Sequence, residues 1–287
     1  MCELLKGKPL VDEETAGLAE RSDALKEREV YPTLATVRVG GKDEDIAYEH
    51  GLKKRALATG VVVKENHLPE DIKEEELEKL ITDLSSDRNV HGILVFEPLP
   101  EHINTEKIHK KIVPKKDVDG VTDVSMAAVY TGKKDAFAPC TAKSCVAILK
   151  HYGIELEGAN VAVMGRSTVI GKPVSMLLTT ENATVTICHS RTRNAAEICR
   201  NADILISCMG KGGYIDSSFT NKDQVIIDVG INFDEEGNII GDVDFEDVCD
   251  KVRAITPVPG GVGSVTTLML MQNVIAAAEE EEKKKQK

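Results

Sequence analysis

The feature that most constrains the fold is a regular alternation of short β-branched runs with segments of helical pattern. In the first part of the chain, strand-like runs at residues 33–40, 60–66 and 90–96 are separated by helical patterns at residues 45–59 and 74–87. Strands that alternate with helices are typical of parallel sheets, because each crossover returns the chain to start the next strand in the same direction. The sequence therefore predicts an α/β fold.

A second series of the same kind begins near Thr141. Its strand-like runs lie at residues 159–165, 183–190, 203–210 and 224–232, with helical patterns at residues 142–153, 172–180 and 195–202. The apolar segment 266–278 is helical in pattern, and we expect it to pack on the first domain. We therefore predict one domain of residues 1–142 completed by residues 266–287, and a second domain of residues 143–265.

Composition excludes several classes of function. The formal charge of -12 repels nucleic acid, and the absence of Trp removes a residue used to stack on bases. The longest apolar runs fall short of the roughly 18 residues of a membrane span, and the N-terminus lacks the apolar core of a signal peptide. The seven cysteines include no Cys-x-x-Cys pair, so we expect free thiols, a cytoplasmic protein and no metal site.

A glycine-containing loop, "VAVMGRSTVIGKP", lies between a predicted strand and a predicted helix. It is a variant of the dinucleotide fingerprint, in which Gly165 permits a tight turn, Ser167 replaces the middle glycine and Gly171 opens the helix. The helix N-terminus then offers N–H groups to a pyrophosphate. A purely structural turn is the alternative, but the strand–loop–helix context favours a cofactor.

The residues after the next strand indicate which cofactor binds. An NAD site usually has an acidic residue about 20 residues after the glycine loop. Here the strand ends in "ICHSRTR", which offers Ser190, Arg191 and Arg193, while Arg166 lies in the glycine loop itself. Guanidinium and hydroxyl groups suit a 2′-phosphate, so we expect NADP. The alternative is that these arginines are solvated surface residues.

Three further loops are rich in proline, glycine and acidic residues: "VFEPLPEHIN", "VPKKDVDGVT" and "ITPVPGGVGSVTT". Such backbone approaches ligands closely, and ligands of open α/β sheets gather at the carboxyl ends of strands. Taken in order, the motifs "HGILV.EPLP", "KKDVDG", "GRSTVIGKP", "CHSRT", "IIDVGIN", "GDVDF" and "TPVPGGVG" span Tyr31 to Asn273. This series resembles the methylenetetrahydrofolate dehydrogenase/methenyltetrahydrofolate cyclohydrolase family.

The resemblance implies a folate-binding domain completed by the C-terminal helix, an NAD(P)-binding Rossmann domain and a homodimer. The implied reaction is hydride transfer from 5,10-methylenetetrahydrofolate to NAD(P)+, often followed by hydrolysis of the methenyl product to 10-formyltetrahydrofolate. Asp119 matches the family position whose carboxylate accepts two N–H groups of the pterin, and Asp117 is the alternative as a turn residue. Tyr48 matches the tyrosine that packs along the aminobenzoyl ring, and its alternative role is that of a half-buried helix residue.

The same resemblance places further residues at the two ligands. On the folate side they are Leu52, Val95, Phe96, Glu97, Pro259, Gly260, Gly261, Val262 and Gly263. On the cofactor side they are Gly165, Arg166, Ser167, Gly171, Ser190, Arg191, Ile231 and Thr266.

The chain departs from the family where hydrolysis is concerned. In the family a lysine four residues after the tyrosine, supported by a glutamine, activates water; here these positions are Leu52 and Phe96. We therefore expect a dehydrogenase with a weak or lost cyclohydrolase step. Two ways of retaining hydrolysis stay open: a π-bulge could bring Lys53 beneath Tyr48, or Glu97 could act as the base. A fully bifunctional enzyme is the alternative, and because some dehydrogenase-only relatives prefer NAD, NAD is the alternative cofactor.

Smaller departures are Asp45, Ser125 and Ser264, which bear on fine folate contacts. Two rival functions remain at this point. One is another two-domain oxidoreductase, such as one resembling shikimate dehydrogenase, which should lack "KKDVDG" and "PVPGGVG". The other is a non-catalytic sensor of folate or NADP, against which the retained Tyr48, Asp119 and glycine loop argue.

Overall fold

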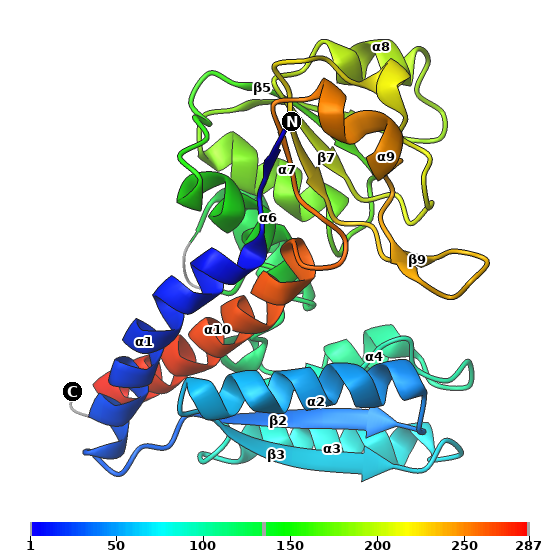
Figure 1. Cartoon of the computed structure of the whole chain (residues 1–287). Helices are drawn as coiled ribbons and strands as arrows, with labels where there is room; N and C mark the ends of the chain where they lie inside the picture. The colour runs from blue at the N-terminus through cyan, green and yellow to red at the C-terminus, as the bar shows by residue number, and fades with distance from the viewer. Residues whose placement is uncertain (1, 134–135, 286–287) are drawn as a thin grey trace. The chain divides into compact units, whose positions relative to one another are not determined.

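The computed structural model describes residues 2–133 and 136–285 and divides into two compact units (Figure 1). One unit comprises Met1–Asp12 and Thr141–Thr266, and the other comprises Glu13–Cys140 and Thr267–Lys287. Helices α1 (Gly7–Lys26) and α10 (Val262–Lys285) contribute residues to both units. The domain boundaries expected from the sequence stay a prediction, and these units differ from them mainly by grouping residues 1–12 with 141–266.

The unit of Glu13–Cys140 contains a three-stranded parallel sheet in the order β3-β2-β4. Its strands are β2 (Thr33–Val39), β3 (Val62–Leu68) and β4 (Gly92–Val95). Each strand is joined to the next by a helix, α2 (Asp43–Ala58) or α3 (Glu74–Ser86), as the alternation predicted. The remaining helical elements are α4 (Thr105–His109), the 3-10 turn η1 (Pro114–Lys116) and α5 (Asp123–Thr131).

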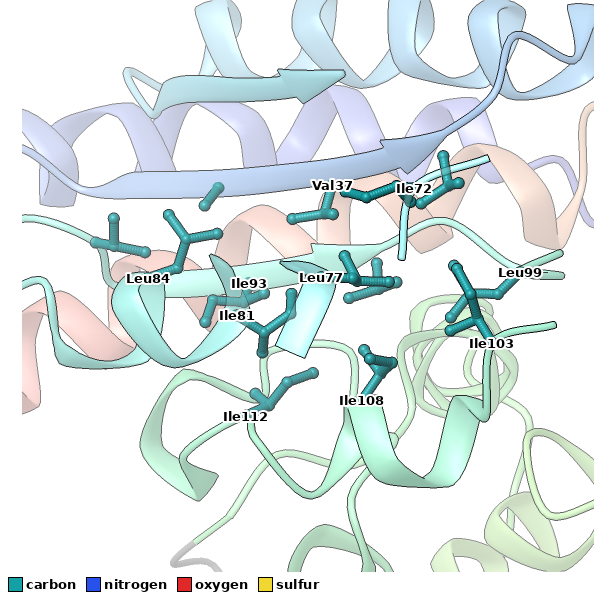
Figure 2. Packing of buried hydrophobic residues seen from close by; sticks show 14 residues of the cluster. Val37, Ile72, Leu77, Ile81, Leu84, Ile93, Leu99, Ile103, Ile108 and Ile112 are labelled. Atoms are coloured by element: carbon teal, nitrogen blue, oxygen red, sulfur yellow. The ribbon is translucent and has the colours of Figure 1, made fainter. Parts of the chain in front are cut away.

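The two faces of this sheet are covered by different helices because successive side chains of a strand point to opposite sides. On one face Thr36 donates a hydrogen bond to Glu49 of α2, and Gly92 leaves room for Val274 of α10. On the other face, strand and helix side chains form the apolar cluster shown in Figure 2, with α3 and α4 packed over β2 and β4. Its members are Ala35, Val37, Val39, Ile72, Leu77, Ile81, Leu84, Val90, Ile93, Val95, Leu99, Ile103, Ile108 and Ile112.

The other unit is built on a six-stranded parallel sheet in the order β1-β11-β8-β7-β5-β6. The strands are β1 (Glu3–Leu4), β11 (Ala254–Ile255), β8 (Val225–Asp228), β7 (Ile204–Ser207), β5 (Asn160–Met164) and β6 (Thr184–Cys188). The connecting helices are α6 (Cys140–His151), α7 (Gly171–Thr180), α8 (Ala195–Arg200) and α9 (Phe245–Val248). The short turns η2 (Ser217–Phe219) and η3 (Cys249–Lys251) complete the unit.

Strand order reverses at β5, which has β6 on one side and β7 on the other. A reversal of this kind is the topological switch point at which doubly wound sheets bind ligands. The chain also contains a small antiparallel pair that the sequence reading missed, β9 (Asn232–Phe233) with β10 (Ile239–Ile240). Residues 224–232, predicted as one strand, are therefore broken after Asp228. Among the described residues, no helix is both long and apolar enough to cross a membrane.

Candidate active site

Tyr48 and Phe96 are brought together at the carboxyl end of β4. Tyr48 lies on α2, Phe96 directly follows β4, and their rings meet edge to face with centroids 5.8 Å apart. Phe96 is buried, whereas Tyr48 keeps 38% of its surface exposed. Desolvation of the phenol, followed by the nearby Asp119 and Cys140, raises the pKa of Tyr48, so this side chain acts as a neutral hydroxyl and a ring face.

The two acids of "KKDVDG" have different roles. The buried Asp117 carboxylate accepts hydrogen bonds from the backbone N–H groups of Val121 and Thr122 and from the hydroxyls of Thr122 and Ser125, at 2.5 to 2.9 Å. It therefore organises the turn, which was the alternative role considered for it. Ser125, a departure from the family pattern, is one of its partners.

Asp119 is the acid left for a ligand. Burial is the main reason that its pKa rises, to about 7, opposed by a hydrogen bond with Cys140 and raised further by the charges of Asp117 and Glu97. Its backbone is fixed by the next residue, because Gly120 has φ +72° and a Cβ there would lie 2.5 Å from the Pro139 nitrogen. A desolvated carboxylate of this kind gains much from a ligand that donates two N–H groups.

The remainder of the "KKDVDG" loop is hydrogen-bonded to the end of α3 and to α10. The buried Lys116 ammonium donates to the carbonyls of Leu84 and Asp87 at the end of α3, at 3.1 and 2.6 Å. Asn273 of α10 donates to the Val118 carbonyl at 2.8 Å. The second of these bonds attaches the C-terminal helix α10 to the loop.

Helix α2 does not bring Lys53 to the site. It is an α-helix throughout Asp43–Ala58, so the π-bulge considered above does not occur. Lys53 instead forms an ion pair with Glu65 of β3 at 3.1 Å. Leu52 is completely buried, which places it in the core rather than on an open ligand surface. The prediction of Lys53 as a catalytic residue therefore finds no support in its position.

The charged residue next to Phe96 has a partner that sequence reasoning missed. Val95 is buried at the end of β4, whereas Glu97 is exposed and its Oε1 lies 2.5 Å from Nε2 of His109, the last residue of α4. Desolvation alone would lower the pKa of His109, but Glu97, then Asp117 and Asp119, raise it above its usual value. No spacing in the sequence relates residue 97 to residue 109, so no local signal could have paired them.

The predicted glycine loop lies at the switch point of the larger sheet. Gly165 follows β5 with φ +139°, and its N–H donates to the Cys188 carbonyl of β6. A Cβ at Gly171 would lie 2.5 Å from the Gly165 carbonyl oxygen, so only glycine allows helix α7 to begin this close to β5. The Ser167 hydroxyl accepts from the N–H groups of Ile170 and Gly171, which fixes the loop.

The predicted arginines lie on adjacent turns. Arg166 follows β5, and Arg191 follows β6, the strand that pairs with it. The β6 turn is held by mutual bonds between His189 and Thr192, and it presents Ser190 and Arg191 to solvent. Within residues 2–133 and 136–285, neither Arg166 nor Arg191 forms an ion pair with a carboxylate, and the exposed Arg193 also forms none. These guanidinium groups are therefore available to an anion.

Two buried acids that the sequence reading did not assign support the loop carrying Ile231. Asp228 accepts from the N–H groups of Gly230, Asp242 and Val243, and burial raises its pKa to about 6 despite these bonds. Asp242 accepts from the N–H groups of Met209 and Lys211 after β7. The motifs "IIDVGIN" and "GDVDF" thus hold Ile231, which is 66% exposed, beside the carboxyl end of the sheet.

The proline–glycine loop before α10 carries the remaining predicted residues. Gly260, at φ +104°, accepts from the Gly7 N–H, and a Cβ at Gly261 would lie 2.6 Å from the Pro257 carbonyl. Val262 is buried, and Ser264 donates to the Gly261 carbonyl. Pro259, Gly263 and Thr266 lie in the same segment, which belongs to the unit of the larger sheet.

One group of potential metal ligands lies elsewhere, on α2 and β3: Glu49, Glu65 and His67. Its buried member, Glu49, is already bound by Arg38 and Thr36 as well as by His67. These bonds account for the burial of Glu49 without an ion.

A parallel sheet with a glycine turn at its switch point places the chain among the doubly wound nucleotide-binding α/β proteins. Models of known protein families support this class and also identify the family. The tetrahydrofolate dehydrogenase/cyclohydrolase catalytic domain matches residues 5–119, and the NAD(P)-binding domain of the same family matches residues 139–282. The chain belongs to the tetrahydrofolate dehydrogenase/cyclohydrolase family, which confirms the resemblance and the fold class.

Individual relatives support the same assignment. The bifunctional protein FolD of Clostridioides difficile (strain 630) is 48% identical over 268 residues, 93% of each chain. The structure of the bifunctional FolD enzyme of Campylobacter jejuni superposes with a TM-score of 0.95 at 37% identity, covering 98% of this chain and 99% of that one. The FolD of Trypanosoma brucei, solved with NADP and an inhibitor, gives 0.91 at 32% identity, covering 97% and 98%. Relatives described as bifunctional support that alternative better than the predicted loss of hydrolysis.

Proposed function

We propose that this protein oxidises 5,10-methylenetetrahydrofolate with NADP+ and then hydrolyses the methenyl product to 10-formyltetrahydrofolate. The observation that carries the proposal is Asp119, a desolvated carboxylate beside Tyr48 that the fold leaves for a ligand while Asp117 holds the turn. The bifunctional character rests on the relatives, which are described as both dehydrogenase and cyclohydrolase.

The residues have separable roles in this proposal. Asp119 accepts the paired N–H groups of the pterin and fixes its orientation. The exposed ring of Tyr48, held against Phe96, packs along the aminobenzoyl group. Within this unit the remaining folate contacts come from Val95 and Glu97, and the family resemblance also assigns the loop Pro259–Gly263 to the folate. Hydride transfer itself needs mainly proximity and orientation, so no acid or base is required for it.

The cofactor site fits NADP on two grounds. Gly171 allows the close approach of α7 to β5 that a pyrophosphate-binding turn needs, and Arg166 and Arg191 lie on adjacent turns with no carboxylate of the described chain paired to them. When bound, NADP+ supplies the nicotinamide that accepts the hydride. Gly165, Ser167 and the start of α7 hold the pyrophosphate. Ser190 and the two arginines would bind the 2′-phosphate, and Ile231 and Thr266 would be further contacts of the cofactor.

A dehydrogenase without hydrolysis is a second candidate, favoured by a specific observation. Leu52 is fully buried at the position where the family has its lysine, and Lys53 forms an ion pair with Glu65. Neither residue takes a proton from water at the site. The experiment below separates the two candidates.

The proposal also covers the domain organisation, the oligomeric state and the location of the protein. We assign folate binding to residues 1–142 with 266–287, and cofactor binding to residues 143–265. We also propose a homodimer, by analogy with the family, and a cytoplasmic location, in keeping with the free cysteines among the described residues. Sedimentation of the purified protein tests the dimer directly.

The test is a stopped assay of purified protein with 5,10-methylenetetrahydrofolate and NADP+. Methenyl- and 10-formyltetrahydrofolate are quantified against the nicotinamide reduced. Formyl product that keeps pace with reduction supports the bifunctional enzyme. Methenyl product that disappears only at the buffer rate leaves the dehydrogenase alone. Folate binding without any reduction of NADP+ or NAD+ overturns both and leaves a sensor.

A further inference from the structure

Two ionisable side chains meet beyond the carboxyl end of β4 in the smaller sheet. Glu97 follows Phe96 at the end of β4, and His109 ends α4. Their side chains approach to 2.5 Å between Oε1 and Nε2, and they retain 38% and 19% of their surface exposed. His109 also borders a surface hollow of about 440 Å³ that is lined in part by Val121 and Thr122.

This pair lies in the same electrostatic neighbourhood as Asp119. The charges of Glu97 and His109 both act on the Asp119 carboxyl, and that of Asp119 acts in turn on His109. Phe96, the residue before Glu97, contacts the ring of Tyr48. The pair is therefore flanked by the residues that the proposed function places on the pterin and on the aminobenzoyl ring.

Apart from Tyr48, whose raised pKa keeps its hydroxyl protonated, the other ionisable groups around Asp119 are already engaged. The Asp117 carboxylate is held by Val121, Thr122 and Ser125. The Cys140 thiol lies 3.3 Å from the Val118 carbonyl oxygen and also interacts with the Asp119 carboxyl. Lys53 is paired with Glu65, and Leu52 cannot carry a proton. In the part of the chain that the structure describes, His109 is hydrogen-bonded to Glu97 through Nε2, and its Nδ1 makes no hydrogen bond.

We propose that His109, held by Glu97, is the general base of the hydrolytic step. The inference rests on the proposed bifunctional activity and replaces the absent lysine–glutamine pair. The Nε2–H donates to Glu97, which leaves the lone pair on Nδ1. This arrangement, in which a carboxylate orients an imidazole that accepts a proton, recurs in hydrolases on unrelated folds.

The step balances as a hydration followed by ring opening. Water attacks the methenyl carbon between N5 and N10, and its oxygen forms the new C–O bond while the C=N π electron pair moves onto nitrogen and His109 Nδ1 accepts one proton. The bond from that carbon to N5 then breaks, and the remaining hydroxyl proton leaves oxygen as N5 gains a proton. The product is the N10-formyl compound, and His109 releases its proton to solvent. Nothing is oxidised or reduced.

The test follows hydrolysis of authentic 5,10-methenyltetrahydrofolate in a buffer that does not itself catalyse the reaction. The wild type is compared with His109→Ala and Glu97→Gln. The dehydrogenase rate is the folding control for His109→Ala, and the thermal unfolding midpoint is the folding control for Glu97→Gln. His50→Ala, which removes an exposed histidine of α2, is the matched control. We expect His109→Ala to lose about 100-fold or more in hydrolysis, as general-base removal does, with the dehydrogenase rate changed less than about 5-fold.

The pH profile separates a base from a merely structural residue. At saturating folate, where protonation of Asp119 in the free enzyme does not limit the rate, wild-type kcat for hydrolysis should rise with pH as His109 loses its proton. Glu97→Gln should move that rise to lower pH, because the carboxylate that favours the protonated imidazole is gone. Wild-type hydrolysis with an undiminished His109→Ala rate overturns this inference alone, as does a parallel loss of both activities. A wild type that does not hydrolyse the substrate overturns the bifunctional proposal, and this inference with it.

Discussion

At the residue scale, one motif separates two aspartates that look alike in the sequence. Asp117 is satisfied by the turn it organises, whereas Asp119 is desolvated and left for a ligand. The sequence placed both acids in a loop, and the family pattern singled out Asp119. Only the hydrogen bonds show why the two cannot exchange roles.

The first prediction concerns this acid. Because the pKa of Asp119 is raised to about 7, lowering the pH below 7 protonates it and removes an acceptor for the pterin. We expect kcat/KM for the folate to fall as the pH decreases from 8 to 6. Asp119→Asn should reduce it about 10- to 100-fold, in line with about 1.5–3 kcal/mol for a charged hydrogen bond, and abolish this pH step. Asp43→Asn, an exposed change on α2, should keep both; an unchanged step in Asp119→Asn contradicts the assignment.

The second prediction concerns cofactor choice. Arg166→Ala should raise KM for NADP about 10-fold or more, the loss of one charge-assisted hydrogen bond, while KM for NAD changes little. Arg253→Ala is the control, because Arg253 precedes β11 at the amino end of the sheet, opposite the glycine turn. Steady-state kinetics with both cofactors measure these KM values. Equal increases in KM for NADP and NAD would contradict the 2′-phosphate assignment.

At the scale of elements, α2 shows how helix geometry decides which side chain reaches the site. Its α-helical path turns Tyr48 outward beside Phe96, buries Leu52 and directs Lys53 to Glu65 of β3. Residues four and five positions after the tyrosine thus lie on different faces. The loss of the family lysine is therefore not repaired by its neighbour in the helix.

The third prediction compares two leucines of this helix. Leu52→Ala should lower the free energy of unfolding by about 2–4 kcal/mol, because it removes a fully buried side chain and leaves a cavity. Leu57→Ala, at a position 84% exposed, makes the same chemical change in the same helix and should cost less than about 0.5 kcal/mol. Denaturant unfolding measures both. Similar values for the two variants would mean that Leu52 faces an open site after all.

At the scale of the whole molecule, each unit holds a buried carboxylate with a raised pKa. Burial raises the pKa of Asp119 to about 7 in one unit and that of Asp228 to about 6 in the other. Both values exceed the roughly 3.9 of an unfolded chain. The folded protein therefore binds more protons than the unfolded chain between about pH 4 and 7, and its stability decreases as the pH rises through that range. Asp247, whose pKa is lowered to about 2, acts oppositely below this range.

The fourth prediction follows from this linkage. Without ligands, the midpoint of thermal unfolding should be higher at pH 5 than at pH 8. Asp119→Asn should flatten the slope and stabilise the protein at pH 8 by on the order of 2 kcal/mol, because it removes a charge whose burial is unfavourable. Melting curves at both pH values for wild type and variant supply the measurement. A variant that is less stable than wild type at pH 8 contradicts the expectation.

The sequence by itself determined the α/β class, the glycine turn, the positions of Arg166 and Arg191 after two strands, and the family. Each of these depends on local patterns of a few residues in a fixed order. It did not determine which groups meet. The contact of Glu97 with His109 and the support of the Ile231 loop by Asp228 and Asp242 join elements distant in the chain. The ion pair of Lys53 with Glu65 likewise crosses from helix to strand. Such partners are set by strand order and helix rotation, which only the packed tertiary structure decides.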